Sequence, residues 1–210
     1  MPHEHEHVHA RREEWDERYS EHDQMWSGEP NGSLTVEVAE LMPGRALDVG
    51  CGEGADAVWL AQRGWTVTAI DVSTVAIDRA RAASNLLGIT VEWIAGDVLT
   101  HMLDDRAFEL VSVHYPAFLF DRDAAAVERI ISLVAPGGTL LVVGHALDHD
   151  ARAHAAEHGF DPDAYVAPAD FVADLDDAWQ VEVHEQRPRV HPPAGSIHAD
   201  DIVVRARRNR

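Results

Sequence analysis

The sequence predicts an α/β protein built on a doubly wound, mostly parallel sheet. Short apolar runs rich in Val, Ile and Leu alternate along the chain with segments whose apolar residues recur every three or four positions. Strand, helix and strand following one another favour a parallel sheet with helices on both faces. A chain of 210 residues accommodates one such domain and is too short for two ordinary ones. We therefore expect a single α/β domain, which we place at 33–210.

The individual elements follow from these runs. Five apolar runs predict the parallel strands, at 45–49, 66–70, 90–94, 108–114 and 138–144. Helical spacing separates them, at Ala57, Val58 and Ala61, at Ala76, Ala80, Ala83 and Leu87, and at Ala124, Val127, Ile131 and Val134. Beyond residue 150 the pattern indicates a helix over 169–175 and two strands over 179–188 and 196–208. These two strands are expected to close the sheet as an antiparallel pair.

Residues 1–10 alternate His with Glu and predict a disordered, His-rich tail. In an extended conformation, one side of this tail would carry four histidines that could bind zinc or nickel, namely His3, His5, His7 and His9. Either way, we do not expect the tail to belong to the folded domain.

Residues 11–32 predict a helix followed by a turn. Trp15 and Tyr19 are four residues apart, a spacing that puts both rings on one helix face. After the turn, Ser33 is expected to cap a second helix over 34–42.

Composition narrows the class of protein. The chain has 17 Lys and Arg against 37 Asp and Glu, so its formal charge of -20 would repel the phosphates of a nucleic acid. No run of about 18 apolar residues predicts a membrane span, and no apolar segment near the N-terminus predicts a secretory signal. We therefore expect a cytoplasmic protein with neither nucleic acid nor membrane as a partner. The oligomeric state stays open.

A glycine-rich turn follows the first predicted strand, where open parallel sheets bind their ligands. Gly50, Gly52 and Gly54 permit positive φ and let a ligand approach the backbone closely. A dinucleotide fingerprint would need its third glycine one position later, where this chain has Ala55. Cys51 lies within the turn and is interpreted as a packing residue or a backbone contact point.

Three acids end three neighbouring strands and predict one pocket. Asp48 would repel a pyrophosphate and favours a cationic ligand group such as an ammonium. Asp71 is placed to accept both hydroxyls of a ribose. Asp97 is placed to meet the amino group of an adenine. Each acid alone would more often be a turn residue, but three around one glycine turn favour a ligand site.

At these positions the chain resembles the class I S-adenosylmethionine-dependent methyltransferases. The resemblance covers roughly residues 33–208 and is carried by five motifs, "LDVGCGEG" (47–54), "VTAIDVS" (67–73), "IAGDVLT" (94–100), "FELVSVH" (108–114) and "LVAPGGTLLVVG" (133–144). It implies a Rossmann-like, seven-stranded sheet with an antiparallel last strand, and S-adenosyl-L-methionine as cofactor. The implied cofactor residues are Asp48, Gly50, Cys51, Gly52, Gly54, Asp71, Val72, Ser73, Asp97, Val98 and Trp26.

Segments near both ends are similar to the branch that contains tellurite-resistance and thiopurine methyltransferase-like proteins. In that branch an aromatic N-terminal segment folds over the cofactor, which implies a lid formed by Trp15, Tyr19 and Trp26. The alternative is that these rings only dock the segment onto the core.

Methyl transfer chiefly requires the acceptor to be aligned and water to be excluded. An acceptor that must lose a proton also needs a base, and the candidate catalytic residues are His114 and Tyr115, with His145 after the next strand. The amino-methylase signature is absent from "SVHYPAF", so we expect a small-molecule acceptor. We assign no residue to a metal.

Two readings from other classes stay open. The first is a nicotinamide-dependent oxidoreductase, which the glycine spacing and Asp48 disfavour. The second is a metal- or metalloid-binding protein that uses the His-rich N-terminus.

Overall fold

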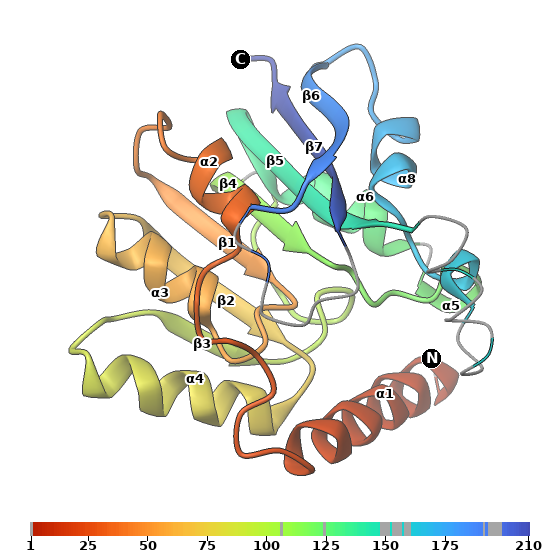
Figure 1. The fold of residues 1–210 in the computed structure, drawn as a ribbon. Coiled ribbons are helices and arrows are strands. Elements are labelled where there is room, and N and C mark those ends of the chain that lie inside the picture. Colours follow the sequence, from red (N-terminus) through yellow and green to blue (C-terminus); the bar gives the residue numbers. More distant parts are fainter. Residues whose placement is uncertain are drawn as a thin grey trace.

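The structure is a computed structural model that describes residues 2–105, 107–123, 125–147, 152, 157, 161–190, 192 and 199–210, with the backbone alone at 2–7, 121 and 122. Its centre is a seven-stranded sheet in the order β3-β2-β1-β4-β5-β7-β6 (Figure 1). The strands are β1 (Arg45–Val49), β2 (Thr66–Asp71), β3 (Glu92–Ala95), β4 (Phe108–His114), β5 (Val134–Ala146), β6 (Trp179–Pro188) and β7 (Asp200–Arg208).

The strand directions confirm the predicted sheet. Strands β1 to β5 pair in parallel, whereas β7 runs antiparallel to both β5 and β6. The strand order reverses beside β1, which pairs with β2 on one side and with β4 on the other. In open α/β sheets this switch point is where a crevice opens at the carboxyl ends of the strands.

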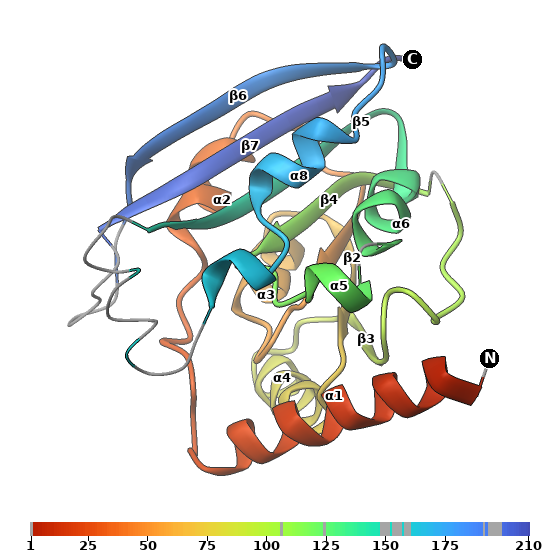
Figure 2. The same cartoon turned by 90° about the vertical axis from the view of Figure 1, so that its right-hand side faces the viewer.

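Helices cover both faces of the sheet (Figure 2). Helices α2 (Gly32–Glu37) and α3 (Ala55–Gln62) lie on one face, and α6 (Ala125–Leu133) and α8 (Pro168–Ala173) lie on the other. Helix α4 (Thr74–Leu86) packs against β2 and β3, and α1 (Pro2–Ser20) runs beside α4. The short elements are α5 (Phe120–Asp123) and the 3₁₀ turn η1 (Pro162–Ala164).

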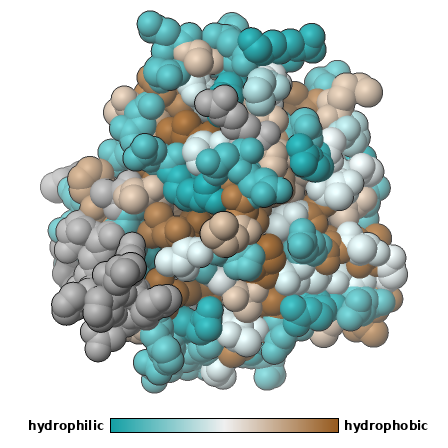
Figure 3. All heavy atoms as spheres, turned by 180° about the vertical axis from the view of Figure 1, so that it is seen from behind, coloured by the Kyte–Doolittle hydropathy of each residue, from teal (hydrophilic) through white to brown (hydrophobic). Residues whose placement is uncertain are grey.

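Each face of the sheet has its own apolar core. One cluster centres on Ile130 and Phe171 from α6 and α8 and on Val111 of β4, and the other on Leu34 and Leu60 from α2 and α3. All five side chains are fully buried. On the outer face seen in Figure 3, hydrophobic residues appear only in separate patches between hydrophilic ones. Burial of this kind fixes the carboxyl ends of the strands in place, because the sheet is held from both sides.

The prediction of a separate disordered tail at 1–10 is wrong for the described backbone, because α1 is helical from Pro2. Proline fits the first turn of a helix, and the Ala, Arg and Glu residues that follow are strong helix formers. The extended conformation on which the predicted row of histidines depended is therefore not the one that the backbone adopts.

Three smaller predictions also need correction. Asn31, not Ser33, is the residue before α2, and Ser33 is buried within the helix, which ends at Glu37. Val134, predicted on a helix, opens β5 and pairs with Phe108, as its β-branched side chain favours. Ala124 and the start of the strand predicted over 196–208 lie outside the described residues.

Candidate functional site

The glycine turn after β1 has the backbone that its sequence predicts. Gly50, Gly52 and Gly54 all have positive φ, at 69°, 52° and 84°. A Cβ on Gly52 would lie 2.9 Å from the Tyr19 hydroxyl oxygen, and a Cβ on Gly54 would lie 2.4 Å from the Trp93 ring. Position 52 thus lets the N-terminal segment approach, and position 54 lets α3 start against Trp93, whereas at Gly50 only the φ angle requires glycine.

Asp71 ends β2 and is held by the backbone on both sides. Its two carboxylate oxygens accept hydrogen bonds from the amides of Gly52 and Ser73, at 2.9 and 2.8 Å. Burial raises the pKa of Asp71, and these two bonds act in the opposite direction. The carboxylate is therefore fixed in orientation at the edge of the glycine turn.

Asp48 is the second-last residue of β1 and is almost fully buried, with 2% of its surface exposed. The Ser112 hydroxyl donates to Oδ1 at 3.4 Å, and Oδ2 has no hydrogen-bond partner among the described residues. Burial, followed by the nearby Asp56 carboxylate, raises the pKa of Asp48 well above its usual range. A buried carboxylate in this state favours any cation that reaches it.

Asp97, after β3, has a partner that the sequence did not predict. Its Oδ1 accepts the Leu99 amide at 2.8 Å, and its Oδ2 accepts from Arg11 of α1 at 2.5 Å. Arg11 also pairs with Asp123 at 2.8 Å. The acid expected to meet an adenine is thus bonded to the N-terminal helix.

The N-terminal segment contacts Glu53 in the glycine turn and Ser73 before α4, and one further hydrogen bond lies within the segment itself. Trp26 Nε1 donates to the Tyr19 hydroxyl at 3.0 Å. The Glu53 carboxylate accepts from the Trp26 amide at 3.0 Å and from Arg79 at 3.0 Å. In α1, Asp16 accepts from the Ser73 hydroxyl at 2.6 Å.

At the carboxyl ends of β4 and β5 a second group of side chains meets. The Tyr115 hydroxyl donates to Asp201 at 3.1 Å and accepts from Arg189 at 3.0 Å, and its ring stacks on His145 with centroids 4.1 Å apart. Burial raises the pKa of Tyr115, and Asp201 adds to that effect, so its hydroxyl stays protonated. With φ at 52°, Tyr115 also holds a strained backbone, which is a feature of functional sites.

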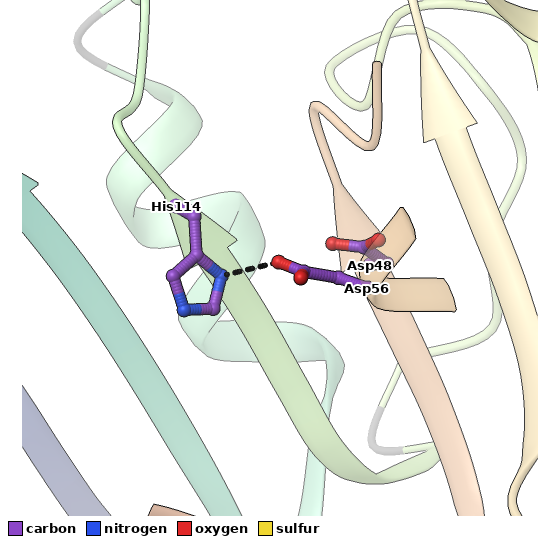
Figure 4. A group of neighbouring side chains, drawn as sticks. All are labelled: Asp48, Asp56 and His114. Atoms are coloured by element: carbon purple, nitrogen blue, oxygen red, sulfur yellow. Dashed lines mark ion pairs between the residues drawn. The ribbon is translucent and has the colours of Figure 1, made fainter. Parts of the chain in front are cut away.

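His114, the last residue of β4, faces the glycine turn from the other side. Its Nδ1 lies 3.3 Å from Oδ2 of Asp56, a residue of the first turn of α3 (Figure 4). The same Asp56 carboxylate accepts two hydrogen bonds from Asn31, at 2.6 and 2.7 Å. Burial lowers the pKa of His114, so its imidazole is neutral near pH 7.

One cavity of about 740 Å³ joins these groups. This volume is in the usual range for small-molecule sites. The predicted residues that line it are Asp48, Gly50, Cys51, Gly52, Gly54, Asp71, Val72, Asp97, Val98, Trp15, Tyr19, Trp26, His114, Tyr115 and His145. Ser73 does not belong to this lining, because its hydroxyl caps α4 by accepting the Ala76 amide at 3.1 Å.

Sequence reasoning missed Arg11, Asp56, Asn31 and Arg189, all of which also line the cavity. No periodicity or spacing marks them, because the fold brings them together from the middle of α1, the first turn of α3 and two loops. Burial raises the pKa of the Cys51 thiol well above its usual value, which disfavours a reactive thiolate at this position.

Residues 46–138 match the methyltransferase domain family. An uncharacterized methyltransferase of Mycobacterium tuberculosis (strain ATCC 25618 / H37Rv) is 32% identical over 122 residues, which cover 58% of this chain and 61% of that protein. A tRNA 5-carboxymethoxyuridine methyltransferase of Escherichia coli (strain K12) is 31% identical over 110 residues, covering 49% and 41%. The chain thus spans less than two thirds of the length of these curated relatives.

Among solved structures, the fold is similar to N-methyltransferase NodS from Bradyrhizobium japonicum WM9 in complex with S-adenosyl-L-homocysteine. The TM-score is 0.71 at 22% identity, with 94% of this chain and 98% of that chain covered. This similarity confirms the predicted Rossmann-like architecture. In the described part of the chain, the longest helices lack the apolar length that a membrane span requires.

Proposed function

We propose that the chain is a class I S-adenosylmethionine-dependent methyltransferase that transfers a methyl group to a small-molecule acceptor, supported by the match of residues 46–138 to the methyltransferase domain family. The observation that carries the proposal is the cavity in which the glycine turn, Asp48 and Asp71 meet. S-adenosylmethionine supplies the activated methyl group when it is bound. The residues of this chain would bind the donor, orient the acceptor and exclude water.

We assign the donor end of the cavity as follows. The fixed carboxylate of Asp71 would accept hydrogen bonds from the ribose hydroxyls with its remaining lone pairs. Val72 and Val98 would line the site of the adenine. The ammonium of the donor would lie beside Asp48 and donate a hydrogen bond to Oδ2, which has no other partner among the described residues. Closing the cavity with Tyr19 and Trp26 would keep water away from the sulfonium.

The acceptor end follows from His114 and Tyr115. With the proton of the neutral imidazole on Nδ1, toward Asp56, the Nε2 atom can take a proton from a thiol, hydroxyl or amine acceptor. Tyr115 keeps its proton and would therefore not act as a base. Its backbone, with positive φ, would fix the side chain in a position to orient the acceptor.

A small molecule is favoured over RNA by the charge of the chain. The formal charge of -20, with acids at the mouth of the glycine turn, disfavours phosphate contacts. The similarity to a tRNA methyltransferase makes RNA the second candidate acceptor. The thiopurine-like branch and the cytoplasmic location both stay predictions.

The test is a turnover screen with labelled methyl donor against thiol, halide, chalcogenide, phenol and amine acceptors, with a bulk tRNA arm. We expect label transfer to one of the small-molecule classes and none to RNA. A thermal-shift comparison should show stabilisation by S-adenosylhomocysteine and none by NADH, because only the former matches the glycine spacing and Asp48. Stabilisation by NADH alone would favour the oxidoreductase instead, and label on tRNA alone would replace the small-molecule acceptor.

A further inference from the structure

Three buried side chains at the floor of the cavity form a group that the proposed reaction does not fully explain. Asp48, Asp56 and His114 come from the end of β1, the start of α3 and the end of β4. Figure 4 shows the imidazole Nδ1 turned toward the Asp56 carboxylate, with the Asp48 carboxylate beside it. One ligand atom from each lies within 4.8 Å of the others.

These side chains are buried and incompletely partnered. The side chain of His114 is 5% exposed and that of Asp56 is 9% exposed. Neither ring nitrogen of His114, nor Oδ2 of Asp48, has a hydrogen-bond partner within the described residues. A buried polar atom without a partner destabilises the fold, so two acids and an imidazole arranged in this way favour a cation between them.

The donor set defines which cation fits. One imidazole and two carboxylates suit zinc and similar first-row divalent ions, whereas magnesium prefers an all-oxygen shell that keeps several waters. In a tetrahedral shell with bonds of about 2.1 Å, ligand atoms lie about 3.4 Å apart, so small rotations of these side chains would close the site. The cavity leaves the fourth position open to solvent or ligand.

The neighbours of the three residues support ligation. Asn31 donates two hydrogen bonds to Asp56, and Ser112 donates one to Asp48. These hydrogen bonds fix the orientation of both carboxylates, as outer partners of metal ligands do. Neither ring nitrogen of His114 has a hydrogen-bond partner among the described residues, so a ring nitrogen is available as a ligand.

We propose that Asp48, Asp56 and His114 form a binding site for a divalent transition-metal ion such as zinc, at the position that the ammonium of the methyl donor would occupy. Bound metal would withdraw Asp48 from the donor and His114 from proton transfer. Metal and donor therefore compete, and each weakens the binding of the other by the same factor. The competition rests on the proposed function, whereas metal binding itself does not.

The test is a calorimetric titration of the full chain, freed of metal with a chelator, with Zn²⁺ and separately with Mg²⁺. Asp56→Asn and His114→Ala are compared with the control His184→Ala, an exposed histidine on β6. Circular dichroism first establishes that each variant is folded. Because other histidines of the chain can also take up zinc, the decisive quantity is the difference between variants.

We expect the wild type and His184→Ala to bind one equivalent of Zn²⁺ that Asp56→Asn and His114→Ala bind at least ten-fold more weakly, with no comparable Mg²⁺ site. Identical titrations for all four proteins would overturn the metal site. Loss of folding in one site variant leaves the other to decide.

A second titration measures S-adenosylhomocysteine with and without saturating Zn²⁺. We expect Zn²⁺ to raise its Kd at least five-fold in the wild type and to leave it unchanged in Asp56→Asn. Equal affinity in both conditions overturns the shared position. No binding of S-adenosylhomocysteine to metal-free protein contradicts the proposed function instead, and leaves the zinc titration to decide the metal site.

Discussion

The two ends of the cavity hold negative charge in different ways. At the glycine turn, Asp48 and Asp71 form no ion pair with the described residues and rely on O–H and N–H donors. At the far end, Asp201 lies 3.4 Å from Arg189 Nε and also accepts from Tyr115. The first end is thus prepared for a cation that arrives with a ligand, and the second is already neutralised. Under the proposed function, a positively charged donor would bind at the first end, and shape and hydrogen bonding would select the acceptor at the second.

Removing the fixed acid at the donor end should have the largest effect. Asp71→Ala eliminates a charge-assisted hydrogen bond to the ribose, so we expect binding of S-adenosylhomocysteine to weaken by roughly 1.5–3 kcal/mol, or about 10- to 150-fold. Calorimetry measures it, with Asp78→Ala on the exposed side of α4 as control. Unchanged affinity in a folded Asp71→Ala protein would remove this residue from the ribose site.

Asp48→Asn should weaken binding of the methyl donor and at the same time raise the stability of the fold. The folded pKa of Asp48 lies above its unfolded value, so its ionisation disfavours the folded state as pH rises through that folded pKa. A stability gain of ~1 kcal/mol should raise the melting temperature of the variant about 2–4 °C above that of the wild type at pH 8. This difference in melting temperature should shrink at pH 4. Melting curves over this range check it, and a gap that widens toward low pH would contradict it.

Tyr115→Phe tests the neutralised end. The variant loses the hydroxyl between Arg189 and Asp201, worth ~1 kcal/mol, so the melting temperature should fall by about 2–4 °C. Affinity for S-adenosylhomocysteine should stay within two-fold of the wild type, because the Tyr115 hydroxyl bonds Asp201 and Arg189 and none of the residues assigned to the donor. A large loss of that affinity would show that the two ends are not separate.

Arg11→Ala should have the smallest effect, and in the opposite direction. Arg11 occupies an oxygen of Asp97 that an adenine amino group would otherwise use. Freeing this oxygen for one hydrogen bond of about 0.5–1 kcal/mol should tighten S-adenosylhomocysteine binding roughly two- to five-fold. The melting temperature should fall, because the buried Asp97 carboxylate loses its ion pair. Weaker binding in this variant would instead make Arg11 part of the binding site.

The two ends also differ in how far the sequence predicts them. The donor end is local: Asp48, the three glycines and Asp71 sit at strand ends that apolar runs mark, so alternation alone locates them. The acceptor end joins β4, β5 and β7 with Arg189 from a loop, and pairs such as Tyr115 with Asp201 leave no trace in spacing. The sequence pattern likewise does not show that the Asn31 amide donates to Asp56. Asn31, and not Ser33, is therefore the residue before α2.

The close approach at Gly52 constrains how this chain can vary. A single added methyl group there would meet the Tyr19 hydroxyl at 2.9 Å and the Trp26 ring nitrogen at 3.2 Å. Position 52 and this aromatic pair are therefore expected to change together during divergence. A homologue with alanine at the place of Gly52 should have smaller residues in place of Tyr19 and Trp26, so an alignment of relatives would reveal these three positions as one inherited unit.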